Sequence, residues 1–231
     1  MAGLTDQASG AKVTGGEAIE RAHQAWQESM LTQLDVLRTE IRITQPGRLA
    51  ANCGASLVEQ QLQLSYWGNE VAISLPELKA YHLVDGTDCS VYDEGMLLYY
   101  LRQADGTPMA ERWIGFRELP AGSFYSQAFQ GYSGDRLARA YGEKPEAFAD
   151  AARIVGGDRL TGLPGVAFAF LPLPCIRLAA ILYPGDEEFA ARASVLFDAS
   201  ASHYMTTDGL ALLGSGLVGR LIAAGQDILT G

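Results

Sequence analysis

The chain has 231 residues, of which 48% are hydrophobic, and its 27 acidic against 17 basic side chains give a formal net charge of -10. So many apolar residues can bury a sizeable core, which excludes a disordered chain. The acidic balance and the scattered basic residues disfavour a phosphate backbone or an anionic lipid surface, so we expect no nucleic-acid and no membrane partner.

The first 15 residues are rich in Gly, Ser, Thr and Ala, which predicts a flexible tail ahead of a single domain over residues 16–231. This start lacks the apolar core of a secretion signal. Cys53, Cys89 and Cys175 are widely spaced without a C-x-x-C pair, a pattern typical of reduced, structural thiols. We therefore expect a cytoplasmic protein without an iron–sulfur or structural zinc site of its own.

The first third of the chain predicts helices followed by a hairpin. Apolar residues recur at helical spacing from Glu17, and a second helical segment ends near Pro46. Over residues 57–66 polar and apolar positions alternate, as in one half-buried strand. A turn follows, residues 71–73 pair back, and residues 81–84 add a third short strand.

The remainder mixes helices and strands. Ser90 or Asp93 caps a helix, and a short strand covers Trp113 to Phe116. The later elements are helical signals over 118–131 and 135–141, a helix from Pro145 to the stop at Gly156, apolar strands over 166–171 and 176–183, and a final helix over 208–229. The strands do not alternate regularly with the helices, so the pattern predicts an α+β fold in a single domain, with a mainly antiparallel sheet and helices packed on it.

The final helix contains the glycine spacing of a dinucleotide-binding loop, at Gly214, Gly216 and Gly219. In such folds the glycines follow a strand and open a helix within a β-α-β unit. Here the match lies inside a helical pattern and only twelve residues follow it. Close helix packing explains the glycines better.

An acidic stretch follows the last apolar strand. Asp186, Glu187 and Glu188 come directly after Tyr183, and Asp198 ends a second apolar segment. If the two segments are neighbours, these carboxylates converge as ligands for a hard cation such as magnesium or calcium. The alternative is a helix N-terminus, with Asp186 as its cap and the two glutamates favoured by the helix dipole.

Three further residues complete the candidate site. His203 lies near Asp198 and two serines, which either form a Ser-His-Asp arrangement or cap the final helix. Arg177, inside an apolar strand, either points to solvent or binds a buried acid or a ligand carboxylate. The candidate ligand-binding residues are Arg177, Tyr183, Asp186, Glu187, Glu188, Asp198, His203 and Tyr204. No catalytic residue and no metal-ligand set is assigned.

Three stretches carry a family resemblance: LYPGDEEFAARASVLFDASASHYMTTD (residues 182–208), WIGFRELPAGSFY (113–125) and GMLLYYL (95–101). They resemble the prokaryotic family called domain of unknown function 3786, which would cover residues 47–231. The family lacks an assigned activity. Some relatives carry an added four-cysteine iron–sulfur module similar to that of corrinoid iron–sulfur proteins, and this chain lacks it. The resemblance implies a setting in anaerobic, metal- or corrinoid-linked metabolism.

The leading functional hypothesis is a binding or accessory protein for a small ligand or a metal-containing cofactor of unknown identity. A second is a carboxylate-dependent, metal-assisted hydrolase or lyase that uses Asp186, Glu188 or Asp198 with His203 as proton shuttle. A third is a structural subunit of a larger complex, so a protein partner stays open.

Overall fold

The computed structural model describes residues 34–230, and the side chains of residues 34–226. The expected tail and the start of the helical pattern from Glu17 lie outside the described residues. The fold is α+β, as predicted, in a single domain. The described chain contains two antiparallel sheets rather than one, with strand orders β1-β2-β3-β4 and β5-β9-β8-β7-β6.

The N-terminal part, residues 34–104, carries the first sheet. Its elements are a helix over residues 34–42, α2 (Pro46–Cys53), β1 (Ser56–Val58), β2 (Gln61–Tyr66), β3 (Asn69–Ser74), β4 (Ala80–His82) and α3 (Val91–Gln103). Burial alternates along β2, as its period-two pattern predicts. The expectation of one strand over residues 57–66 is wrong, because Glu59 adopts a positive φ of 52° and the chain turns back between β1 and β2.

Helix α2 is an element that the sequence pattern missed, as it also missed a short strand over Asp158–Leu160. Pro46 opens it, where the missing N–H of proline costs nothing. Gly54 ends it in the left-handed conformation, with φ 65°, and its amide donates to the Ala50 carbonyl. Ser90 caps α3 as predicted, accepting a hydrogen bond from the amide of Asp93.

The C-terminal part, residues 113–230, carries the second sheet. Its elements are β5 (Trp113–Gly115), a 3-10 turn (Phe116–Glu118), α4 (Gly122–Tyr132), α5 (Gly134–Tyr141), α6 (Pro145–Ile154), β6 (Asp158–Leu160), β7 (Val166–Leu173), β8 (Ile176–Tyr183), β9 (Arg192–Asp198), a second 3-10 turn (Ala201–His203) and α7 (Thr207–Thr230). The apolar strands β7 and β8 pair with each other as expected. A hydrogen bond joins this part to the N-terminal part: the Trp67 amide, just after β2, donates to the Pro172 carbonyl in β7 at 2.9 Å.

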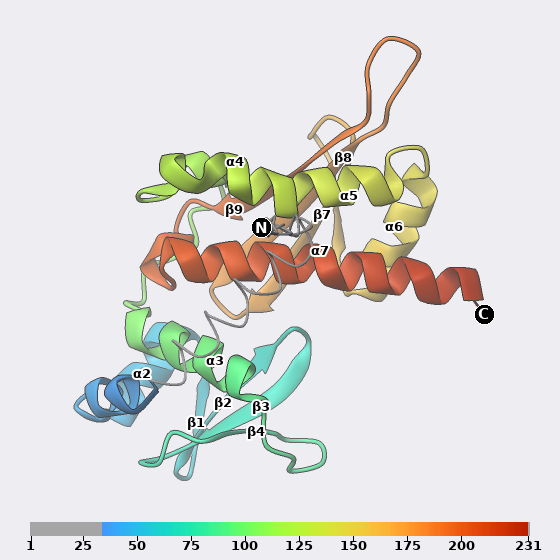
Figure 1. Cartoon of the computed structure of the whole chain (residues 1–231). Coiled ribbons are helices and arrows are strands. Elements are labelled where there is room, and N and C mark those ends of the chain that lie inside the picture. The colour runs from blue at the N-terminus through green and yellow to red at the C-terminus, as the bar shows by residue number, and fades with distance from the viewer. Residues whose placement is uncertain (1–33, 231) are drawn as a thin grey trace, which may run out of the picture.

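Helix α7 crosses the middle of the molecule, with α4 and α5 on one side and the first sheet and α3 on the other (Figure 1). A Cβ on Gly214 would lie 2.8 Å from Cζ of Phe129, so this glycine permits close packing, as predicted. Among the described residues, the stretch Thr207–Gln226 is the one helix long and apolar enough to cross a membrane. Half of it is buried, as in the core helix of a globular fold.

Candidate functional site

The sequence-predicted residues fall into two groups at opposite ends of the β8–β9 hairpin. Tyr183 pairs with Arg192 at one end, and Leu178 pairs with Phe197 near the other. Asp198 therefore lies one strand length, about 20 Å, from the loop that carries Asp186. The expected convergence of these carboxylates is wrong, because antiparallel pairing sends the two segments to opposite ends.

Residues 184–191 form the loop that joins β8 to β9, and this loop projects away from the body of the molecule (Figure 1). Asp186 accepts hydrogen bonds from the amides of Glu188 at 2.9 Å and Phe189 at 2.7 Å. It therefore caps a turn. The alternative prediction, a helix N-terminus, is also wrong, because the chain reverses here into β9. Glu187 and Glu188 are exposed.

Asp198 is only 1% exposed and serves the fold. Its Oδ1 accepts hydrogen bonds from the amide of Ser200 at 2.9 Å, the hydroxyl of Ser200 at 2.6 Å and the amide of Ala110 at 2.9 Å. Burial raises the pKa of this carboxyl, but these donors outweigh it and hold the pKa below its ordinary value. Through this oxygen atom, Asp198 holds the end of β9 to the segment that precedes β5.

Arg177 and Tyr183 both lie in cation–aromatic contacts. The guanidinium of the half-buried Arg177 lies over the Trp113 ring, 5.2 Å from its centroid. The Arg192 guanidinium lies 5.9 Å from the Tyr183 ring centroid. Arg177 thus finds an aromatic face on β5 rather than solvent alone, an arrangement common for arginine.

His203 and Tyr204 lie where the two parts of the chain meet, beside residues that follow α3. Nδ1 of His203 is 2.7 Å from Oδ2 of Asp105 and 3.2 Å from the Thr107 hydroxyl oxygen. The hydrogen bond from His203 is the main reason that the pKa of Asp105 falls to about 2. The Tyr204 hydroxyl donates to the Thr107 carbonyl. An Nδ1–H directed at a carboxylate leaves Nε2 as the basic nitrogen.

The sequence reasoning missed Asp105, which it treated only as part of a loop. Asp105 and His203 are 98 positions apart, and no spacing pattern links them. Their pairing follows from packing elsewhere: the Tyr204 ring stacks on that of Tyr100 at 5.9 Å, and the Gln103 amide donates to the Ser202 carbonyl at 2.8 Å. These contacts fix the end of α3 against the segment after β9.

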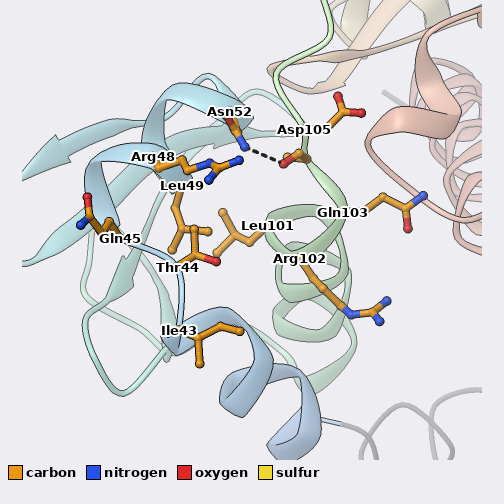
Figure 2. Close-up of a pocket in the computed structure, with 11 residues that line it drawn as sticks. Ile43, Thr44, Gln45, Arg48, Leu49, Asn52, Leu101, Arg102, Gln103 and Asp105 are labelled. Carbon is orange, nitrogen blue, oxygen red and sulfur yellow. Dashed lines mark hydrogen bonds between the residues drawn. The ribbon is translucent and has the colours of Figure 1, made fainter.

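A pocket of about 670 Å³ opens beside this junction, between α2 and α3 (Figure 2). It is lined by Ile43, Thr44, Gln45, Arg48, Leu49, Asn52, Leu101, Arg102, Gln103, Ala104 and Asp105. In Figure 2, Arg48 and Asn52 reach from α2 toward α3, and the Asn52 amide donates to the Ala104 carbonyl at 3.1 Å. The pocket volume lies within the range of about 300–1,000 Å³ typical of small-molecule sites.

A family model described as "Domain of unknown function (DUF3786)" matches residues 45–220. The chain belongs to the DUF3786 family. The matched region includes α2, α3, both sheets and most of α7. It therefore contains Asp105 and His203 and all of the pocket lining except Ile43 and Thr44. No curated protein matches the chain, and no solved structure matches it.

The described part of this DUF3786 protein contains no group of three or more His, Cys, Asp or Glu side chains that could hold a metal ion. Asp105 and His203 supply two such side chains.

Proposed function

We propose that this DUF3786 protein binds a small, negatively charged molecule in the pocket between α2 and α3. The observation that carries the proposal is the guanidinium of Arg48, which lines the pocket and has no hydrogen bond or ion pair with any described residue. Arginine binds carboxylate and phosphate groups through two parallel hydrogen bonds. The other arginine of the lining, Arg102, is paired with Glu40.

Neutral polar groups beside Arg48 suit the same kind of ligand. Thr44 and Gln45 line the pocket on the side of the helix over residues 34–42, and Asn52 lies one turn beyond Arg48 on α2. Hydroxyl and amide groups can donate to the oxygens of an anion while the apolar side chains of Leu49 and Leu101 contact its carbon skeleton. These side chains would bind and orient a ligand, and binding alone does not require a catalytic residue among them.

Calorimetric titration at low ionic strength with inorganic phosphate, succinate and citrate tests the proposal. We expect at least one probe to bind, and Arg48→Ala to weaken it by about 10-fold or more, since hydrogen bonds to charged groups contribute about 1.5–3 kcal/mol. Arg139→Ala is the matched control, because Arg139 is an exposed arginine on α5 outside the pocket. Binding that is equally weak in both variants, or absent in the unmodified chain, contradicts the proposal.

The pairing of His203 with Asp105 favours a second candidate, a hydrolase in which His203 acts as general base. A carboxylate at Nδ1 fixes the tautomer whose Nε2 can take a proton from water. Hydrolysis of p-nitrophenyl acetate should then fall in His203→Ala and stay unchanged in His82→Ala. Equal rates in the two variants would leave only the binding proposal.

The metal-containing cofactor and the anaerobic, corrinoid-linked setting stay predictions. Their support is the family resemblance of the sequence. Neither is needed for the pocket to hold a small anion.

A further inference from the structure

Two of the three cysteines lie on either side of the Tyr100 hydroxyl although they are far apart in the chain. Cys53 is the last residue of α2, and Cys175 lies in the turn between β7 and β8. The Tyr100 hydroxyl donates to the Cys53 carbonyl at 2.7 Å and accepts from the Cys175 amide at 3.1 Å. Because one oxygen atom bridges both groups, the two cysteine backbones are close neighbours.

The Cys175 sulfur lies against the residue that follows Cys53. A Cβ placed on Gly54 would be 3.2 Å from Sγ of Cys175 and 3.0 Å from Cβ of Pro174. The missing side chain at Gly54 therefore lets the β7–β8 turn approach the end of α2. These contacts bring the Cys175 sulfur to the end of the helix that carries Cys53. A disulfide bond between the two residues requires their Cα atoms to come within about 4.4–6.8 Å of each other.

The two thiols differ in accessibility, which gives them different chemical roles. Cys175 is partly exposed, whereas Cys53 is 0% exposed. Burial raises the pKa of the Cys53 thiol to about 11, and the neighbouring Cys175 adds to this rise. An external reagent therefore meets Cys175 first, and Cys53 is placed to react second.

We propose that Cys53 and Cys175 form a disulfide bond that joins α2 to the β7–β8 turn when the protein meets a low-molecular-weight disulfide such as oxidised glutathione. The Cys175 thiolate attacks one glutathione sulfur, and a glutathione thiolate leaves. Cys53 then attacks the Cys175 sulfur, and the second glutathione leaves as a thiolate that takes up the proton from the Cys53 thiol. Two protein thiols are oxidised, and one glutathione disulfide is reduced to two thiols.

The bond links the N-terminal part, residues 34–104, to the C-terminal part, residues 113–230. Asn52, directly before Cys53, lines the pocket, so the bond also fixes one wall of that pocket. The inference does not depend on the proposed ligand, because it rests on the contacts of Tyr100 and Gly54 alone.

Thiol trapping of the full chain tests the proposal. The folded protein is incubated at pH 8 with oxidised glutathione, then alkylated and measured by intact mass and peptide mapping. We expect a Cys53–Cys175 cross-linked peptide with Cys89 still alkylated. The oxidised protein should also show a Tm raised by about 5 °C or more, which dithiothreitol reverses, because the bond closes a long loop.

Single substitutions separate this result from general thiol reactivity. Cys53→Ala and Cys175→Ala should each abolish the cross-link, and Cys89→Ala, which removes another buried thiol, should retain it. The proposal is overturned if Cys175 stops at a mixed disulfide with glutathione, if dimers form instead, or if the cross-link appears only in urea.

Discussion

Replacing Asp198 by alanine should destabilise the fold without touching the pocket. Oδ1 of this carboxylate accepts three hydrogen bonds, two from Ser200 and one from Ala110, and the side chain is 1% exposed. Alanine removes the shared acceptor and leaves three donors facing a buried space. With about 1 kcal/mol for each lost bond and a further penalty for unsatisfied buried donors, the expected loss is about 3–5 kcal/mol.

The matched variant Asp198→Asn separates charge from geometry. All three bonds go to one oxygen, so an asparagine carbonyl can accept them again, without the added strength of an ionised acceptor. We expect a loss of about 1–2 kcal/mol, clearly smaller than that of alanine. Denaturant unfolding of the two variants and the parent measures both numbers. A loss below about 1 kcal/mol for alanine, or equal losses for both variants, would refute the reasoning.

The pKa of Asp198 also determines how its contribution to the stability of the fold changes with pH. Because hydrogen bonding holds the pKa of Asp198 below its ordinary value, its contribution to stability is present above the unfolded pKa of about 3.9. It is lost as the pH falls through the lower folded pKa. The stability difference between the parent and Asp198→Asn should therefore be constant near neutral pH and shrink below about pH 4.

Two further predictions concern the junction and the core. His203→Ala should raise the pKa of Asp105 from about 2 toward its ordinary value, because the bond from His203 is the largest cause of the shift; an NMR titration with an unchanged pKa would contradict this. Gly214→Ala should cost about 1–3 kcal/mol, because its Cβ would lie 2.8 Å from Phe129, which is itself buried. Gly219→Ala should stabilise α7 by about 0.5–1 kcal/mol, because nothing lies within 4 Å of the added Cβ. Thermal unfolding measures both variants, and a Gly214→Ala protein more stable than Gly219→Ala would contradict this packing.

Local patterns in the sequence were enough for most of the secondary structure. The long apolar runs of β7 and β8, the Ser90 cap and the Pro145 helix start each depend on neighbouring residues only. The errors in the predicted strands arose where the backbone conformation does not follow from the residue types. Glu59 adopts a positive φ, which residues other than glycine seldom do. The turn between β1 and β2 therefore has no signal in the sequence.

The candidate site was harder to predict because it depends on register and on long-range packing. The acids of residues 186–188 were expected beside Asp198, since both follow apolar segments. Whether two segment ends meet depends on strand direction, and the antiparallel pairing of β8 with β9 separates them. Asp105 has no distinguishing neighbours in sequence, and only the packed junction brings it to His203.

The distance between the two ends of the β8–β9 hairpin also determines which of the sequence-predicted residues can contact the same ligand. His203 and Tyr204 follow β9 and contact the residues after α3: His203 bonds to Asp105, which lines the pocket, and Tyr204 bonds to Thr107. Asp186 lies beyond the opposite end of β8 and β9, about 20 Å away, and its carboxylate already holds two amides of its own loop. A small molecule in the pocket cannot span that distance. The proposed ligand binding and the proposed general-base role of His203 therefore belong to the same region, where α2, α3 and the segment after β9 each contribute polar groups.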